Sequence, residues 1–442
     1  MTMRQYSSRS QDFKEWLNAL LTRRDCAYDG IQGAVAAIVE AVRERGDEAL
    51  VELTERYDQV SLNRERLRVK RTDLTRARES LPRADRQALE LAARRIRDFH
   101  RRTLEKGFQY RDALGIRLGQ IVQPLQRVGI YVPGGGAAYP STVLMNAIPA
   151  QVAGVPEIVM VCPATAPASQ RVVFAAAAIA GVTEVYRVGG AQAVAALAYG
   201  TQTIRRVDKI VGPGNAYVQA AKRMVYGVAD IDMAAGPSEV LVIADDSADA
   251  AWVAADLIAQ AEHGSGDEAA ILITPSARLA DAVDAALDRQ LIDLPRAEAV
   301  RVVMERRGAA IVVRDLEEAC ELANQIAPEH LELEVQQAGR WARKLHAAGA
   351  IFLGAHSPAP FGDYIAGPNH VLPTGGWARF ASPLGAYDFV KRSSIIQATP
   401  TALRKLGPTV ARLARMEGFE GHARALEQRL EAARRSKPGD GN

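Results

Sequence analysis

Seven histidines occur in this chain, and four of them stand beside other groups that can bind a metal or transfer a proton. His263 ends the segment Gln260-Ala261-Glu262-His263. Residues three apart project from one face of a helix, so the amide of Gln260 and the imidazole of His263 can serve together as ligands of a divalent cation. Such a pair is also typical of a histidine that stabilises a helix C-terminus, and the spacing alone leaves both interpretations open.

Glu329 and His330 are adjacent where a predicted helix gives way to the alternating segment His330-Leu331-Glu332-Leu333. A carboxylate beside an imidazole can supply two general acid/base groups of different basicity. The same pair can equally be charged and solvated. Asp363 and His370 follow in a stretch rich in proline and glycine, and loops on a rigid α/β scaffold commonly carry catalytic groups, although this loop can also be a simple connection.

A metal in this protein would be held by nitrogen and oxygen. The cysteines Cys26, Cys162 and Cys320 are far apart, so the chain has no CxxC pair. His422 opens the last predicted helix, and its simplest interpretation is a surface histidine in a tail. Together with Gln260, His263 and Asp363 it would complete a mixed ligand set that suits zinc, but the spacing does not show that the four converge.

The usual dinucleotide fingerprint, G-x-G-x-x-G, is absent. Glycines nevertheless follow three predicted strands, at Pro133–Gly136, Gly189-Gly190 and Gly212–Asn215. Such loops let the backbone approach a phosphate or ribose at the carboxyl edge of a parallel sheet. Tight turns that require glycine are the alternative interpretation.

Alternating strands and helices must position these groups. Apolar runs and helical spacing predict strands at Glu157–Cys162, Glu184–Val188, Lys209–Val211, Val240–Ala244, Ala270–Thr274, Ala310–Val313 and Ile351–Leu353, separated by helices at Ser169–Ala180, Ala191–Ala198, Ala216–Tyr226, Ala248–Ala261, Arg278–Asp288 and Leu316–Ile326. This alternation predicts an α/β protein with two successive Rossmann-like parallel-sheet domains.

The two ends of the chain are predicted to be mainly helical. Helical spacing at Ala34–Arg45 and Arg86–Arg102 predicts an N-terminal scaffold, which β-like runs at Ile116–Val122 and Val128–Val132 follow. In the tail, Gly407-Pro408 and Gly418 are expected to divide the chain into short helices. These helices are predicted around Leu403–Leu406, Val410–Met416 and Ala423–Arg435.

We expect residues 1–130 plus 238–380 to form the domain with the catalytic and metal-binding residues, residues 131–237 to form a second α/β domain that binds NAD, and residues 381–442 to form a helical tail. The 442 residues suffice for this organisation.

Composition argues against nucleic acid and membrane as partners. Lys and Arg number 55 against 52 Asp and Glu, without a basic block. The longest apolar run, near Val172–Val182, is shorter than the roughly 18 residues of a membrane span, and the N-terminus lacks the apolar core of a signal peptide. We therefore expect a cytoplasmic protein.

Seven motifs, in this order between about residues 10 and 430, resemble the histidinol dehydrogenase family. They are Val132-Pro133-Gly134-Gly135, Gly189-Gly190-Ala191-Gln192-Ala193, Gly212-Pro213-Gly214-Asn215, Ala235-Gly236-Pro237-Ser238-Glu239, Gln260-Ala261-Glu262-His263-Gly264, Ala327-Pro328-Glu329-His330-Leu331 and Gly362-Asp363-Tyr364.

The resemblance implies a zinc enzyme that oxidises L-histidinol through L-histidinal to L-histidine with two NAD, in an intertwined homodimer whose tail crosses to the partner. It implies one zinc per subunit, with ligands Gln260, His263, Asp363 and His422, which also contact the substrate. It implies further substrate contacts at Ser238, His330, His370 and Glu417, and NAD contacts at Tyr131, Gln192 and Asn215.

The same resemblance implies that Glu329 and His330 are the catalytic pair, and their chemistry agrees. Imidazole has an unperturbed pKa near 6.5 and can accept the hydroxyl proton while hydride leaves carbon. A carboxylate can take a proton from the water that adds to the aldehyde. The metal would mainly hold the substrate's imidazole and amine in place.

Three alternatives remain at this stage. A paralogous zinc dehydrogenase could act on another polar alcohol such as a sulfonated propanediol, but His370 and Glu417 favour histidinol. A catalytically inactive zinc-binding or dinucleotide-sensing protein would have no need of Glu329 and His330. A thiohemiacetal on Cys162 is the rival route for aldehyde oxidation, although a buried cysteine usually acts as a small apolar residue.

Overall fold

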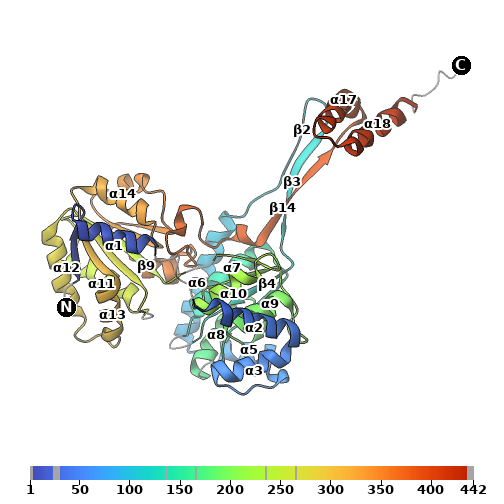
Figure 1. Ribbon diagram of the computed structural model, residues 1–442. Coiled ribbons are helices and arrows are strands. Elements are labelled where there is room, and N and C mark those ends of the chain that lie inside the picture. The colour runs from blue at the N-terminus through green and yellow to red at the C-terminus, as the bar shows by residue number, and fades with distance from the viewer. Residues whose placement is uncertain are drawn as a thin grey trace. The chain divides into compact units, whose positions relative to one another are not determined.

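The computed structural model describes residues 3–22, 30–134, 138–164, 167–233, 236–263 and 266–435. By its contacts the chain divides into two units. The first comprises Met1–Leu104 and Leu125–Phe389, and the second comprises Glu105–Pro124 and Val390–Asn442. The first unit contains two parallel sheets with helices, so the predicted α/β class is confirmed (Figure 1).

One sheet of the first unit has six parallel strands. Their order is β1 (Arg4–Ser7), β11 (Gly308–Val312), β10 (Ala269–Thr274), β9 (Glu239–Ala244), β12 (His330–Glu334) and β13 (Ala350–Leu353). Side chains alternate between its faces. One face packs against α11 (Ala250–Ala261), α12 (Ala277–Gln290) and α13 (Ala297–Arg307), and the other against α1 (Gln11–Thr22) and α14 (Leu316–Ile326). Helices on both faces explain why β9 and β10 are buried throughout.

The other sheet has five parallel strands. Their order is β6 (Glu184–Tyr186), β5 (Glu157–Val161), β4 (Arg127–Tyr131), β7 (Lys209–Val211) and β8 (Asp230–Ile231). Its helices are α5 (Arg71–Glu79), α6 (Arg83–Arg102), α7 (Pro140–Ala153) and α8 (Pro167–Ala180) on one face, with α2 (Gln32–Arg45), α3 (Asp47–Asp58), α9 (Gly190–Tyr199) and α10 (Ala216–Val225) on the other.

The N-terminal helices pack differently from the predicted grouping of residues 1–130 with 238–380. Apolar residues of α2 and α3, such as Val35 and Leu50, lie in the core of the five-stranded sheet. Of the described N-terminal helices and strands, β1 and α1 join the six-stranded sheet, where β1 extends it beside β11. The chain therefore contributes its first strand to one sheet and its next helices to the other.

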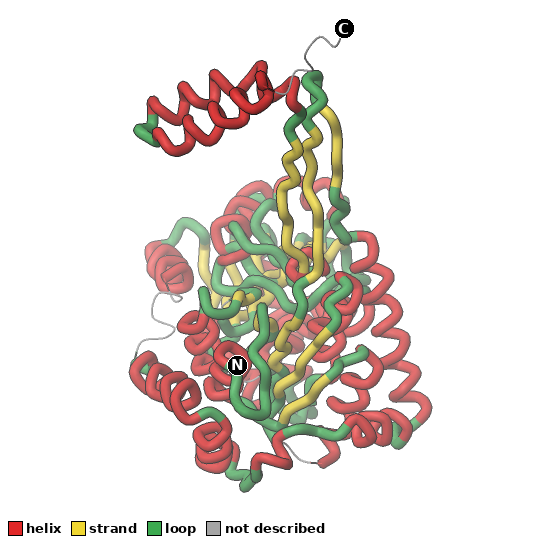
Figure 2. The backbone as a smooth tube through the Cα atoms, turned by 90° about the vertical axis from the view of Figure 1, so that its right-hand side faces the viewer, coloured by secondary structure: helices red, strands yellow, loops and turns green. Residues whose placement is uncertain are grey.

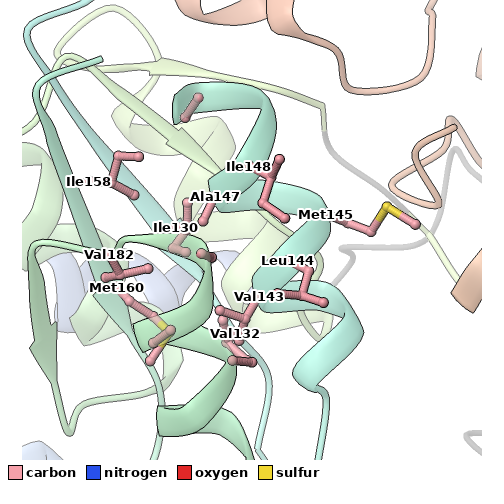
Figure 3. Close-up of a cluster of buried hydrophobic side chains, with 14 of the residues drawn as sticks. Ile130, Val132, Val143, Leu144, Met145, Ala147, Ile148, Ile158, Met160 and Val182 are labelled. Carbon is pink, nitrogen blue, oxygen red and sulfur yellow. The ribbon is translucent and has the colours of Figure 1, made fainter. Parts of the chain in front are cut away.

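Helix α7 was not predicted from the sequence. Val143 and Ala147 of α7 lie beside Ile130 of β4 and Val132, which follows this strand (Figure 3). Residues on all sides of α7 are buried, so its sequence lacks the alternation of apolar and polar faces that marks a surface helix. Pro149 within it is a further signal against a helix.

The second unit combines an antiparallel sheet with two helices. Strand β3 (Arg117–Pro124) lies between β2 (Phe108–Arg111) and β14 (Val390–Gln397), and α17 (Pro400–Met416) and α18 (Glu420–Arg435) follow (Figure 2). The predicted break at Gly407-Pro408 is wrong, since α17 continues through it. Gly407 instead allows close packing, because a Cβ there would lie 3.0 Å from Leu430 of α18. Gly418, with φ +81°, does separate the two helices.

Candidate functional site

Glu329 and His330 are both held by the backbone of Glu239. Strand β12 begins at His330 and pairs in parallel with β9, so the three residues meet at the amino edge of the six-stranded sheet. The Glu239 N–H donates to Glu329 Oε2 over 2.8 Å, and His330 Nδ1 lies 3.1 Å from the Glu239 carbonyl oxygen. Both side chains are buried, so their positions are fixed by these bonds.

Asp363 approaches the other nitrogen of the same imidazole. Its Oδ1 lies 3.2 Å from His330 Nε2. Asp363 belongs to the π-helical turn η2 (Gly362–Ala366), which Arg95 of α6 anchors by donating to the Ile365 carbonyl oxygen over 2.5 Å. His370 Nδ1 donates to the Asp363 carbonyl oxygen over 3.0 Å. Arg95 and His370, far apart in sequence, therefore hold the backbone of the turn that carries this carboxylate.

These contacts set the protonation of the cluster. Burial raises the pKa of Glu329 to about 7, although nearby His330 opposes the shift. Burial disfavours a charged His330, but Glu329 and Asp363 outweigh it and raise its pKa to about 9. Because Nδ1–H donates to a carbonyl, a neutral His330 would turn a lone pair on Nε2 toward the Asp363 carboxylate, which favours the imidazolium. Burial also opposes ionisation of Asp363, yet His330 holds its pKa below the ordinary value.

Two predicted ligands, Gln260 in the last turn of α11 and His263 two residues after this helix ends, contact each other. Gln260 Nε2 and His263 Nδ1 lie 2.9 Å apart at the C-terminal end of the helix. The two orientations of the Gln260 amide have almost the same shape, so its Oε1 can occupy the place of Nε2 after rotation of the amide. His263 also contributes to the lowered pKa of Asp363, which places its ring within electrostatic reach of that carboxylate.

The structure thus gathers Gln260, His263 and Asp363 in one region of the first unit. His422 and Glu417 belong to the second unit. Both are exposed, Glu417 after the end of α17 and His422 in α18 with its ring centroid 5.2 Å from that of Phe419.

The predicted substrate contact Ser238 directly precedes β9. It is half-buried, and its carbonyl oxygen accepts from the Ala269 N–H over 3.1 Å. The neighbouring Gly236 N–H donates to the Thr374 hydroxyl, while the Gly375 N–H donates to Glu239 Oε1 over 2.7 Å. Loops before β9 and after His370 are therefore tied together beside Glu329 and His330.

The predicted NAD contacts lie at the carboxyl edge of the five-stranded sheet. Tyr131 ends β4, and its hydroxyl accepts from the Gly190 N–H over 3.1 Å. Burial raises the pKa of this phenol, so it stays neutral. Gln192 is buried in α9, and in the described ranges its Nε2 finds no acceptor. Asn215 caps α10 by accepting from the Val218 N–H over 3.1 Å, whereas Gly135 and Gly136 lie outside the described residues.

Three carboxylic acids near the site were missed. Asp256 lies on α11 one turn before Gln260, and Glu332 and Glu334 share a strand face with His330. One oxygen from each lies within 4.8 Å of the others. Burial raises the pKa of Glu332 to about 8 and that of Glu334 to about 9. The sequence carried a signal for the two glutamates. Residues two apart in a strand share a face, so His330, Glu332 and Glu334 lie on one face of a buried strand.

Glu239 was not singled out either, although it begins an otherwise apolar strand. A charge at such a position demands partners, and this was the signal for it.

Cys162 is buried, and burial raises the pKa of its thiol to about 12. A thiol of this kind is a poor nucleophile, which disfavours the thiohemiacetal route.

Comparison with known proteins gives consistent matches along the chain. The family model described as histidinol dehydrogenase matches residues 21–430. Histidinol dehydrogenase of Bordetella parapertussis is 53% identical over 96% of both chains. That of Neisseria meningitidis serogroup B is 51% identical over 97% of this chain and all of the relative.

A solved structure agrees with these matches. Histidinol dehydrogenase from Elizabethkingia anophelis superimposes with a TM-score of 0.89 and 33% identity, covering 98% of this chain and 99% of that one. Among the described helices of this chain, none has both the length and the apolar character needed to cross a membrane.

The acidic trio yields a prediction about stability. Glu334 has a raised pKa of about 9, so between its ordinary value of 4.5 and pH 9 the folded chain holds a proton that the unfolded chain has lost. Stability therefore falls as pH rises through this window. Replacing Glu334 by Gln removes this loss, and we expect the Tm at pH 8 to rise by roughly 2 °C, with little change at pH 5.

Thermal unfolding of wild type and E334Q at both pH values measures this. E298Q, at an exposed position, is the matched control and should leave the Tm nearly unchanged. A lower Tm for E334Q at pH 8 would contradict the prediction and would mean that the ionised trio stabilises the fold by binding a cation.

Proposed function

The chain belongs to the histidinol dehydrogenase family, and from this premise we propose that it oxidises L-histidinol through L-histidinal to L-histidine, using two NAD and one zinc per subunit. The observation that carries the proposal is the buried arrangement of Glu329 and His330 on the backbone of Glu239, with Asp363 on the far side of the imidazole. It joins two proton-transfer groups to a predicted metal ligand.

The residues present suit a zinc ion. Gln260 and His263 bring an amide and an imidazole to within 2.9 Å of each other, and Asp363 adds a carboxylate within electrostatic reach. Neutral nitrogen and oxygen donors with one carboxylate are a suitable set for zinc, with positions left for substrate. We propose His422 as the fourth protein ligand. Bound zinc would supply a Lewis acid that holds the substrate's imidazole and amine.

His330 is the proposed base of the first oxidation. The histidinol hydroxyl gives its proton to imidazole nitrogen while hydride leaves the carbon for the nicotinamide. This requires neutral His330, yet its pKa of about 9 beside Glu329 and Asp363 makes that form the minor one near pH 7. A carboxylate that shares its charge with a cation attracts the imidazolium less, so Asp363 as a metal ligand would lower this pKa.

Glu329 is the proposed base of the second oxidation. Water adds to the aldehyde and gives one proton to the carboxylate, and the hydrate then loses hydride to a second NAD. With a pKa of about 7, Glu329 is about half ionised at neutral pH, which matches a group that must take and release protons there.

Other residues of the site are proposed to bind. Ser238, His370 and Glu417 would contact histidinol, and Tyr131, Gln192 and Asn215 would contact NAD. The buried, unpartnered donor of Gln192 supports the cofactor role, because such a group usually meets a partner when a ligand binds.

We also propose that the protein is an intertwined homodimer whose tail brings His422 and Glu417 to the partner's site. Considered by itself, the second unit leaves apolar side chains exposed: Leu406, Val410, Leu413, Met416 and Phe419. Clustered exposed apolar side chains of this kind mark surfaces that bind another protein.

The reaction predicts a fixed yield. Protein stripped by a strong chelator should be inactive, and zinc should restore activity, with two NADH formed per L-histidinol consumed. Absorbance of NADH and chromatography of histidine measure this. A sulfonated propanediol is the control substrate and should give far slower NADH formation. One NADH per histidinol, or full activity of verified metal-free protein, would contradict the proposal.

Glu329→Gln should separate the half-reactions. Glutamine can still accept from Glu239 but cannot act as a base, so histidinal oxidation should fall by roughly 10²–10⁴-fold, and oxidation of histidinol to histidinal much less. In wild type, kcat/KM for histidinal should rise with pH around 7 as Glu329 ionises.

Each half-reaction is measured with its own substrate. E332Q is the matched control, since it removes another buried carboxyl, three residues further along the chain in β12, and should leave the ratio of the two rates unchanged. Equal loss of both half-reactions in E329Q would remove the proposed division of labour.

Two inactive variants should rescue each other if the tails cross. In a mixed dimer of D363N and H422N, one site carries both defects and the other draws intact Asp363 and His422 from different chains. Random exchange makes about half the dimers mixed, so about a quarter of wild-type activity should return. Exchange verified by mass spectrometry without recovered activity would exclude the crossed arrangement or the role of His422.

A further inference from the structure

A buried ion pair holds the glycine turn after β7. Lys222 of α10 and Asp232, which follows β8, form this pair, and their side chains are 0% and 1% exposed. Neither residue belongs to the motifs or the proton-transfer groups described above. An ion pair this deeply buried is costly to desolvate, and it is often no more stabilising than an apolar pair of similar size. We therefore attribute the role of this pair to the backbone geometry that it fixes rather than to added stability.

The pair binds both polar groups of one residue, Gly212. The Gly212 N–H donates to Asp232 Oδ2 over 2.7 Å, and Lys222 Nζ donates to the Gly212 carbonyl oxygen over 2.9 Å. Asp232 Oδ1 accepts from Lys222 and from the Met233 N–H. The backbone of Gly212 is thereby fixed on two sides by opposite charges.

Gly212 has no freedom to adjust. Its φ is +116°, and a Cβ there would lie 2.2 Å from the Tyr131 carbonyl oxygen. The turn therefore packs against the end of β4, whose Tyr131 hydroxyl in turn accepts from the Gly190 N–H. The turns at Gly190 and Gly212 are linked through Tyr131 in this way, and the Lys222–Asp232 pair fixes the second of them.

Two buried amides beside these turns point to a ligand. Gln192 Nε2 and Gln219 Oε1 are buried, and neither has a hydrogen-bond partner in the part of the chain that the structure describes. Gln219 Nε2 donates to the Gly214 carbonyl oxygen over 3.4 Å, so this amide lies on the turn itself. A donor and an acceptor left open beside glycine backbone suit the polar edge of a nucleotide.

We propose that Lys222 and Asp232 are positioning residues for NAD, which hold Gly212–Asn215 in the conformation that meets the dinucleotide. The inference rests on the proposed function, because it assumes that the turn binds NAD. It assigns the pair no contact with the cofactor: the charges act through Gly212.

Lys222→Met keeps the length of the side chain and removes its charge. We expect the dissociation constant and the KM for NAD to rise roughly tenfold, as for the loss of one charged hydrogen bond, with kcat changed less than about threefold. The KM for histidinol and the zinc content should not change. Lys209→Met is the matched control, because Lys209 pairs with Asp230 over 3.0 Å across the same two strands at their other end.

A double variant separates positioning from stability. Removing both charges in K222M/D232N leaves no unpaired charge, so its Tm should recover relative to K222M. The KM for NAD should stay high, because the Gly212 carbonyl oxygen still lacks the hydrogen bond that Lys222 donated. If the KM returns to the wild-type value together with the Tm, the pair is only structural and the inference is wrong.

NAD binding measured by calorimetry, without turnover, distinguishes the two proposals. Wild type that binds NAD but does not oxidise histidinol would refute the proposed reaction and leave the positioning role intact. If K222M binds NAD as tightly as wild type, the positioning role alone is refuted. If wild type itself does not bind NAD, both are refuted.

Discussion

The backbone of Glu239 is the constraint on which the rest of the site depends. One residue at the start of β9 presents its N–H to Glu329 and its carbonyl oxygen to His330. This is feasible only because β9 and β12 are adjacent and parallel in the sheet, which sets their register. Glu329 and His330 are thus positioned by main-chain atoms that every substitution of Glu239 except proline retains, and helices cover both faces of the sheet.

What the sequence could and could not predict depends on whether a feature leaves a local pattern or arises from tertiary packing. Strands and helices around the sheets follow from apolar runs and glycine-marked ends, and the fold class was predicted from them. Helix α7 was not, because a helix buried on every side has no amphipathic period. The continuity of α17 through Pro408 depends on how closely Gly407 packs against Leu430, which is a tertiary contact.

Individual site residues show the same limit. His263 and Glu329 stood out because their neighbours in sequence could do chemistry. Glu239, Asp256 and Lys222 did not, since each acquires its meaning from a partner on another element: Glu239 from β12, Asp256 from the glutamates of that strand, and Lys222 from Asp232. Local patterns reveal reactive residues, whereas the residues that hold them in place become visible only when the strands are paired.

Charge placement then divides the carboxylic acids of this region into separate roles. Asp363 faces an imidazolium, and its pKa is lowered, so it remains an anion. Glu329 meets the same imidazole at a longer distance, 3.7 Å, and burial dominates, so its pKa rises to about 7. Burial, together with the neighbouring acids Asp256 and Glu332, raises the pKa of Glu334 to about 9, so it holds its proton at neutral pH. Side-chain carboxyl groups therefore supply an anion, a group that exchanges protons near neutrality and a neutral acid. The differences follow from how far His330 offsets the effect of burial at Asp363 and Glu329, and from the neighbouring acids that add to it at Glu334.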